Sequence, residues 1–181
     1  MNTSTIAEVA IGNGLVQGQS QDGVYSFKGI RYAAPIEGIN RWLSPQEPVV
    51  ITDTFDATHF GPSAPQLVVS RLFWLMPKAG LAMMRMMGGM TEPGPDCLSL
   101  NVWTTALKQT AEKKLPVMFW IHGGGLASGG GSIASSDGGH LAKRSNVVVV
   151  SVNYRLGGIG FLAGDGLFED NICAGNRGFC L

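Results

Sequence analysis

The sequence contains few charged residues, and this limits the classes of protein to which the chain can belong. Charged residues make up only 14% of the 181 positions, against about 25% in an average soluble domain. The 13 basic and 13 acidic residues cancel, so nothing electrostatic favours binding to nucleic acid or to an anionic membrane surface. Because 45% of the residues are hydrophobic, the composition indicates a chain built mostly from buried elements, as in the interior of a larger α/β protein.

Cysteine is also scarce. Cys97, Cys173 and Cys180 are neither even in number nor regularly spaced, which argues against a disulfide framework. The sequence has no Cys-x-x-Cys pair and no His/Cys cluster, so we expect neither a metal site nor a cofactor. The first eight residues carry no basic segment followed by an apolar one, as a secretory signal does. A cytoplasmic location is therefore expected.

A long apolar run is the third feature that the sequence lacks. Six of the eight methionines fall between Met76 and Met90, but Pro77, Lys78 and Arg85 interrupt this stretch. A bilayer span needs about 20 mostly apolar residues, so no membrane partner is expected. Two interpretations stay open for the methionines: a helix packed on a sheet edge, or an adaptable apolar wall at the mouth of a pocket.

Short β-type runs separated by turn signals open the chain. The turns are Gly12-Asn13-Gly14 and Asp22-Gly23, and Asn-Gly and Asp-Gly are strong hairpin signals. An antiparallel meander is therefore predicted, with strands over residues 6–11, 15–19 and 24–32. Residues 33–95 are rich in proline and turn residues, and we expect a long irregular excursion there with one helical insert.

The pattern changes from Cys97 onward. Three apolar runs, the last of them rich in valine, indicate strands of a mostly parallel sheet covered on both faces; they cover residues 98–103, 115–121 and 147–154. Asp137 can cap a short helix over residues 137–144. A strand, a helix and a strand make one βαβ crossover, so the last two strands are predicted to lie parallel and side by side. The predicted class is α/β, with antiparallel strands at the N-terminus followed by parallel central strands.

The most informative motif is His122-Gly123-Gly124-Gly125, which directly follows the predicted buried strand 115–121. Glycines at such a turn let backbone N–H groups face a site with no side chain in the way. Two N–H groups aimed at one point can hold the negative oxygen of a tetrahedral acyl intermediate. The motif supplies half of a hydrolase site. A nucleophile on its own turn, with a base and an acid behind it, does not follow before Leu181.

Other candidate residues favour structural interpretations. Ser132 lies in a Gly-Gly-Ser-Ile-Ala segment that nearly matches a nucleophile elbow, but it follows a glycine-rich loop and not a strand. The segment 123–131 lacks the Gly-Lys-Ser/Thr ending of a phosphate loop. His59 and His140 have no partners at a suitable spacing and are expected at the surface.

Five segments together extend from residue 27 to residue 162. They are Phe27–Pro35 with Gly38–Trp42, Phe60–Ser63, Asp96–Val102, His122–Gly125 with Gly129, and Val150–Leu156 with Gly160–Leu162. In content and order they resemble the type-B carboxylesterases, the cholinesterase-like branch of the α/β-hydrolase fold. One segment alone would be weak evidence, but five in order leave little room for chance.

The resemblance implies that residues 1–181 are the N-terminal portion of a single α/β-hydrolase domain. The fold would be incomplete and would end before the nucleophile elbow. The full-length protein is then expected to be a serine carboxylesterase that hydrolyses a small-molecule ester through an acyl-enzyme. In this family the N–H groups of Gly124 and Gly125 would be the oxyanion donors, and His122 would be structural. Gly124→Ala is expected to lower kcat roughly 100- to 1,000-fold while the protein stays folded.

Several departures from the family pattern matter. Ala64 stands where secreted relatives often have the cysteine that bonds to Cys97, which agrees with a reducing compartment. Pro95 replaces the glutamate that would pair with Arg41. The family's Asp-Gln pair, which would meet Arg155, does not appear, so this guanidinium is expected to be unpaired or forced to solvent.

These departures favour a chain that is inactive on its own and only marginally stable. Strand 147–154 is expected to keep a free apolar edge, which makes self-association a further expectation. The alternative to an esterase is a catalytically inactive truncated fragment or a non-enzymatic interaction protein of the same fold.

Overall fold

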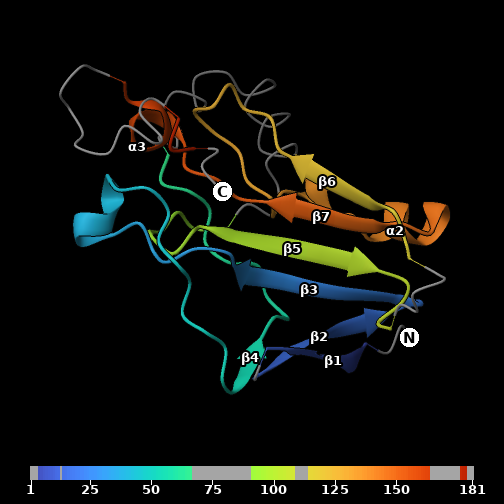
Figure 1. Ribbon diagram of the computed structural model, residues 1–181. Coiled ribbons are helices and arrows are strands. Elements are labelled where there is room, and N and C mark those ends of the chain that lie inside the picture. Colours follow the sequence, from blue (N-terminus) through green and yellow to red (C-terminus); the bar gives the residue numbers. More distant parts are fainter. Residues whose placement is uncertain (1–3, 13, 67–90, 109–113, 164–175, 179–181) are drawn as a thin grey trace.

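The structure is a computed structural model that describes residues 4–12, 14–66, 91–108, 114–163 and 176–178. These residues form a seven-stranded mixed sheet in the order β1-β2-β3-β5-β7-β6, with β4 paired to β2 beside it (Figure 1). The strands are β1 Thr5–Ile11, β2 Gly14–Gln21, β3 Val24–Arg31, β4 Thr54–Asp56, β5 Ser99–Thr104, β6 Val117–Ile121 and β7 Val148–Val152. The helical segments are η1 Gly38–Arg41, η3 Ala134–Ser136, α2 Gly139–Ser145 and α3 Gly157–Phe161.

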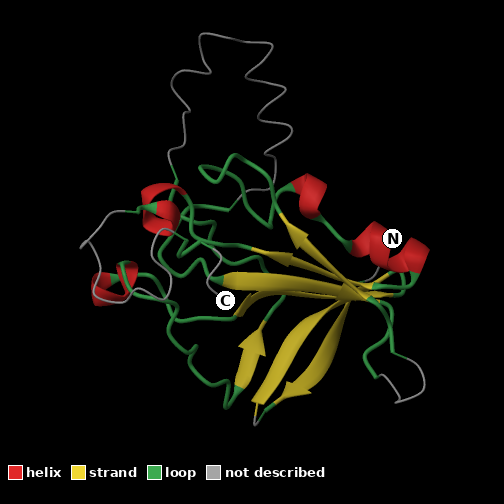
Figure 2. Cartoon of the chain, turned by 45° about the horizontal axis from the view of Figure 1, so that its top comes forward, coloured by secondary structure: helices red, strands yellow, loops and turns green. Residues whose placement is uncertain are grey.

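The predicted N-terminal meander is confirmed. Strands β1, β2 and β3 pair antiparallel in chain order. Asp22 and Gly23 join β2 to β3 with φ angles of 52° and 80°, the left-handed pair that a two-residue hairpin turn requires. Strand β2 then changes partner, because its first residues pair in parallel with β4 and only its last three pair with β3. Figure 2 shows the strands fanning out as the sheet twists.

The βαβ crossover is confirmed as well. Strands β6 and β7 are parallel neighbours, with Val117 opposite Val148. The connecting helix α2 begins at Gly139, two residues later than predicted, but Asp137 still acts at its start because its Oδ1 accepts the Gly139 N–H at 2.8 Å. Ala142 of α2 packs into a buried cluster with Trp103 and Val149, which fixes the helix on one face of the sheet.

Three expectations about these strands are wrong. The 98–103 strand is not part of a parallel sheet, because β5 runs antiparallel to both β3 and β7. The 147–154 strand has no free edge, because β7 lies between β5 and β6. The 115–121 strand is not buried, since every side chain of β6 is at least 40% exposed. A run of apolar residues indicates a strand, but it carries no information on the direction or position of that strand in the sheet.

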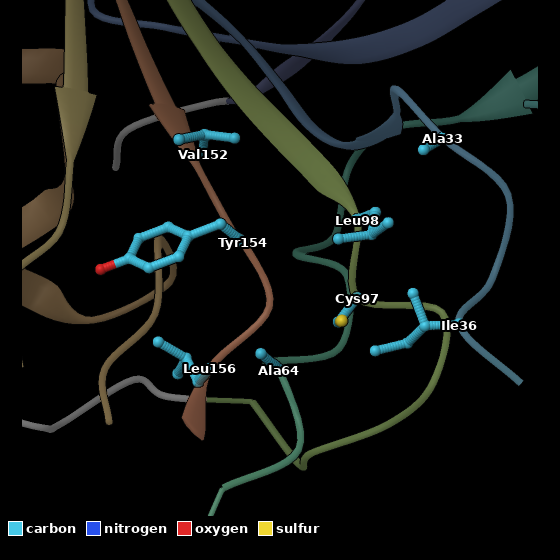
Figure 3. Close-up of a cluster of buried hydrophobic side chains, with 8 residues drawn as sticks. All are labelled: Ala33, Ile36, Ala64, Cys97, Leu98, Val152, Tyr154 and Leu156. Atoms are coloured by element: carbon cyan, nitrogen blue, oxygen red, sulfur yellow. The ribbon is translucent and has the colours of Figure 1, made fainter. Parts of the chain in front are cut away.

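The main hydrophobic cluster lies beyond the ends of β5 and β7, and Figure 3 shows its eight buried residues. It includes Cys97 and Ala64, which come from different segments and share this core. The cluster consists of Ala33, Ile36, Ala64, Cys97, Leu98, Val152, Tyr154 and Leu156. A second buried cluster joins Val16 and Phe27 of the N-terminal strands to Ala7 and Ala57.

The methionine-rich segment 76–90 lies outside the described residues, and so does the predicted helical insert. Among the helices that the structure describes, none has the length and apolar character needed to cross a membrane. The same described residues contain no group of three or more His, Cys, Asp or Glu side chains arranged to hold a metal ion.

Candidate functional site

The glycine motif lies in the loop that follows β6, at the carboxyl ends of the two parallel strands. Ligands of open α/β sheets bind at this edge. The loop turns sharply, and Gly124, Gly125 and Gly129 have φ angles of 130°, 63° and 116°. Residues with a side chain rarely adopt such values, so the geometry explains why glycine occupies these positions. Both Gly124 and Gly125 are exposed to solvent.

The peptide groups on the two sides of Gly124 differ in their hydrogen bonding. The Gly124 carbonyl is taken, because it accepts hydrogen bonds from the N–H groups of Ala127 (3.2 Å) and Ser128 (3.1 Å) and from the Ser128 hydroxyl (3.2 Å). Within the described part of the chain, no acceptor receives the N–H of Gly124 or of Gly125. An oxyanion site needs two such donors that converge on one point.

Gly124 has no room for a side chain. A Cβ atom added there would lie 1.8 Å from the carbonyl oxygen of Ser128. The expectation that Gly124→Ala leaves the structure intact therefore needs refinement, since the loop must shift to admit the methyl group. Gly125 differs, because nothing lies within 4 Å of its added Cβ and only its positive φ opposes substitution.

His122 has a structural role at the start of the loop, as the sequence predicted. The side chain is buried, with 3% of its surface exposed. Its ring stacks on Tyr154 with 4.5 Å between the centroids, and its Nδ1 lies 2.9 Å from the Gly123 carbonyl oxygen. The Tyr154 hydroxyl donates to the His122 carbonyl at 2.8 Å. Burial lowers the pKa of His122, so the imidazole is held neutral.

This burial predicts a pH dependence of stability. In the unfolded chain His122 takes up a proton near its ordinary pKa of 6.5, whereas the folded chain resists protonation until the pH is lower. The free energy of unfolding should therefore be greatest above pH 6.5 and fall as the pH drops below it. Urea denaturation at several pH values between 7.5 and 5 measures this slope. His122→Phe keeps an aromatic ring against Tyr154 and should flatten the slope, and equal slopes in the two proteins would contradict the prediction.

A buried polar network holds the far end of the loop, and sequence reasoning missed it. The Asn153 side chain accepts the Gly131 N–H at 2.6 Å and donates to the Pro62 carbonyl at 3.0 Å. Ser151 donates to the Gly131 carbonyl at 3.2 Å. The available signal was the pair of polar residues that interrupts the valine run of residues 147–154.

Gln66 was also missed. Its side chain reaches the loop from a segment 63 positions earlier and pairs with both the N–H and the carbonyl of Gly129, at 2.9 Å each. The sequence offered no signal for this contact, because an isolated glutamine in a proline-rich stretch is typical of a surface position.

Arg155 is placed differently from the expectation. Its side chain is buried at 1% exposure, and Nη1 donates to the carbonyl oxygens of Leu43 (2.8 Å) and Arg41 (3.2 Å). It is neither unpaired nor forced to solvent, because main-chain carbonyls beside η1 act as its acceptors. Arg41 contributes this carbonyl and is itself exposed.

The remaining candidates lie where the sequence predicted. Ser132 is buried in the turn region before η3, and its hydroxyl oxygen accepts the Thr91 N–H at 3.2 Å. It is not at the end of a strand, so it is not on a nucleophile elbow. His59 and His140 are exposed. The expectation that His59 has no partner is wrong, because its Nδ1 lies 2.6 Å from the Thr58 hydroxyl oxygen and 3.9 Å from a carboxylate oxygen of Asp56.

An open apolar hollow of about 230 Å³ lies on the N-terminal part of the sheet. Its lining does not include the glycine loop, so it is separate from the candidate site. The lining residues are Val9, Ile11, Val16, Phe27, Ile30, Val102, Thr104, Ala106, Leu107 and Val148.

Comparison with known families gives one match over nearly the whole chain. The model described as "Carboxylesterase family" matches residues 5–180. Among curated proteins, the chain is 39% identical over 151 residues to para-nitrobenzyl esterase of Bacillus subtilis (strain 168), which covers 82% of this chain and 27% of that protein. It is 37% identical over 172 residues to phenmedipham hydrolase of Pseudarthrobacter oxydans, which covers 95% of this chain and 32% of that protein.

Solved structures agree. A PNB esterase structure superposes with a TM-score of 0.75 at 36% identity, over 96% of this chain and 32% of that one. A carboxylesterase of Geobacillus stearothermophilus superposes with a TM-score of 0.73 at 37% identity, over 94% of this chain and 31% of that one. These neighbours are esterases of the α/β-hydrolase fold. The chain spans about a third of the length of the proteins that it matches.

Proposed function

The chain belongs to the carboxylesterase family, and from this membership we propose that it supplies the oxyanion-hole loop of an enzyme that hydrolyses small-molecule carboxylic esters. The observation that carries the proposal is the pair of N–H groups at the exposed residues Gly124 and Gly125, which lack an acceptor within the described residues. They lie at the carboxyl edge of the parallel strand pair, where an ester carbonyl can approach them.

The proposed reaction places developing negative charge on these two donors. A serine hydroxyl, activated by a histidine and an acidic residue, attacks the ester carbonyl, whose oxygen becomes an oxyanion. The N–H groups of Gly124 and Gly125 donate to that oxygen more strongly in the transition state than in the bound ester. One such donor typically contributes about 2.7–4 kcal/mol to catalysis. By family resemblance the serine, the histidine and the acid come from the part of the fold that follows residue 181.

The substrate is proposed only at the level of its class. The names of the two relatives describe action on different molecules, para-nitrobenzyl esters in one case and phenmedipham in the other. The methionine-rich segment 76–90, which would bear on the choice of ester if it forms the pocket wall and not a packed helix, lies outside the described residues. A chemically simple ester, p-nitrophenyl acetate, is therefore the suitable probe.

A chimera tests the proposal directly. Residues 5–180 replace the matching region of the Bacillus subtilis para-nitrobenzyl esterase, whose remaining chain completes the fold. The proposal expects a folded chimera that hydrolyses p-nitrophenyl acetate and is inhibited by a serine-directed phosphonate. A chimera with a cooperative thermal melt but no turnover would contradict it. Separately, an in-frame Asp-Gln followed by Gly-Glu-Ser-Ala-Gly beyond the codon for Leu181 would support an enzyme, whereas a stop codon there would favour the non-catalytic alternative.

The isolated chain is expected to hydrolyse no ester. Without an activated nucleophile the tetrahedral oxyanion does not form, so the two N–H donors have no anion to stabilise. Purified residues 1–181 should therefore show the same rate with p-nitrophenyl acetate as buffer containing an equal amount of a non-enzymatic protein. Turnover above this background that a serine-directed phosphonate abolishes would contradict the prediction.

We also propose that the isolated chain self-associates, but through β6 and not through β7 as the sequence suggested. Val148 donates its N–H to the Pro116 carbonyl at 2.8 Å, so Pro116 faces β7. Because the backbone groups of a strand alternate in direction, those of Val117, Phe119 and Ile121 face away from β7, on a side where no strand of the described residues pairs with β6. An antiparallel copy centred on Phe119 would pair all of these groups, and β6 carries no charge to oppose it.

A cytoplasmic location remains a proposal. Cys97 is a buried free thiol, and burial raises its pKa to about 12. Its neighbour in the hydrophobic cluster is Ala64 (Figure 3), which has no sulfur with which to form a disulfide. A reducing compartment suits a protein of this kind.

A further inference from the structure

We propose that Gln66 is a positioning residue for the loop 122–131: its side-chain amide holds Gly129 and thereby sets the directions of the N–H groups of Gly124 and Gly125. The inference rests on the proposed function for its catalytic consequence. Its structural content concerns only contacts within this chain and is tested separately.

The side-chain amide of Gln66 makes three hydrogen bonds, two of them to Gly129. Its Nε2 donates to the Gly129 carbonyl at 2.9 Å and to the Ala64 carbonyl at 3.1 Å. Its Oε1 accepts the Gly129 N–H at 2.9 Å. Both amide hydrogens are therefore used, and the orientation of the group is determined. One rigid amide that pairs with the N–H and the carbonyl of a single residue restricts both backbone dihedrals of that residue.

Gly129 is the point at which the loop returns to its own beginning. Its φ is 116°, and a Cβ added there would lie 2.5 Å from the Gly123 carbonyl oxygen and 2.5 Å from Nδ1 of His122. The backbone of Gly129 thus packs against the first residues of the motif with no intervening side chain. A shift of Gly129 displaces Gly123 and His122, or opens a gap beside them.

The contact reaches Gly124 through Ser128. Ser128 precedes Gly129, and both its N–H (3.1 Å) and its hydroxyl (3.2 Å) donate to the Gly124 carbonyl. The backbone of Ser128 also fills the space beside Gly124, where an added Cβ would meet its carbonyl oxygen at 1.8 Å. Since the carbonyl of Gly124 and the N–H of Gly125 belong to one peptide plane, holding this carbonyl directs that N–H.

The beginning and the middle of the loop have other anchors, which leaves a distinct role to Gln66. The Tyr154 hydroxyl holds the His122 carbonyl at 2.8 Å, and the Gly157 N–H holds the Leu126 carbonyl at 2.7 Å. Gln66 is the side chain that binds both polar groups of Gly129. Its loss should therefore loosen the loop locally and leave the sheet intact.

Two variants and one control separate this role from general stability. Gln66→Met keeps the length of the side chain and removes all three hydrogen bonds. Gln66→Glu keeps the acceptor for the Gly129 N–H, but at neutral pH it sets a carboxylate oxygen against the carbonyls of Gly129 and Ala64. The matched control is Gln46→Met, because Gln46 is exposed and, among the described residues, its side-chain amide bonds to its own segment alone, at the Ser44 carbonyl.

The first arm of the test measures amide hydrogen exchange by NMR in the 181-residue chain. In Gln66→Met, the Gly129 amide and the Ser128 amide should exchange roughly tenfold faster, because local opening of the loop becomes more favourable when its hydrogen bonds are lost. The Gly124 and Gly125 resonances should shift, while amides in β5 and β7 keep their protection. Unchanged exchange at Gly129, or unchanged resonances at Gly124 and Gly125, would overturn the inference.

The second arm measures hydrolysis of p-nitrophenyl acetate by the chimera. Gln66→Met should lower kcat roughly 10- to 100-fold, because small displacements of a catalytic donor are costly, and KM should change less than twofold. Gln66→Glu should lower kcat by a similar factor at neutral pH, and Gln46→Met should have the same kcat as the parent chimera. An unchanged kcat, or a change in KM alone, would overturn the inference. If the parent chimera has no activity, the proposed function fails, and the exchange experiment alone decides whether Gln66 sets the loop.

Discussion

Gly124→Ala should lower the kcat of the chimera for p-nitrophenyl acetate roughly 100- to 1,000-fold or more, since a loss of 100- to 1,000-fold is associated with one oxyanion donor. The reason lies in the space beside Gly124. An alanine Cβ would lie 1.8 Å from the Ser128 carbonyl oxygen, so the peptide groups on both sides of Gly124 must turn. Both candidate N–H donors belong to those peptide groups. KM should change much less than kcat, because the donors act mainly on the transition state.

Two substitutions serve as controls for this result. Gly125→Ala meets no atom within 4 Å and keeps its N–H, so it bears only the cost of a left-handed residue, about 1–2 kcal/mol, and should lose far less activity. Gly158→Ala, in α3, also meets open space and should leave kcat unchanged. A thermal melt confirms that each variant is folded. Full turnover by folded Gly124→Ala would show that the N–H groups of Gly124 and Gly125 do not bind the oxyanion.

Phe119→Lys should convert the self-associated 181-residue chain to a monomer, with a dissociation constant raised roughly 100-fold. In the proposed antiparallel pairing Phe119 lies opposite its own copy, so the variant loses the aromatic contact between the two Phe119 rings and sets two like charges face to face. Lysine on an edge strand opposes edge-to-edge pairing in natural proteins, and directly opposed like charges are destabilising. Sedimentation velocity at several protein concentrations measures the change.

The opposite edge of the sheet provides the matched control. Among the strands that the structure describes, β1 lies at the other edge, and Ile6 on it is 67% exposed. Strand β1 already carries Glu8, which would oppose its own copy in a symmetric pairing, so β1 is the less favourable edge. Ile6→Lys should therefore leave association unchanged. A parent chain that is monomeric at all concentrations, or association that Ile6→Lys removes and Phe119→Lys does not, would contradict the proposed interface.

The sequence by itself determined the features that depend on a few neighbouring residues. Asp22-Gly23 predicted its hairpin, because a two-residue turn needs left-handed φ angles that few residue types tolerate. The apolar runs predicted the strands, and the spacing around Asp137 predicted the βαβ crossover. The ordered motifs from Phe27 to Leu162 predicted the family, which the comparisons confirm. In each case the information lies in local backbone preference or in a short pattern of residue types.

Tertiary structure alone decided which elements meet. The direction of β5, the central place of β7 and the exposed edge of β6 depend on long-range pairing, and a strand has the same residue pattern in several such positions. The partners of Gln66 and Arg155 were invisible for a related reason. Both side chains bind main-chain groups, at Gly129 and beside η1, and every residue carries such groups. The residue type shows that a side chain needs a hydrogen-bond partner, but only the tertiary structure determines which backbone group becomes that partner.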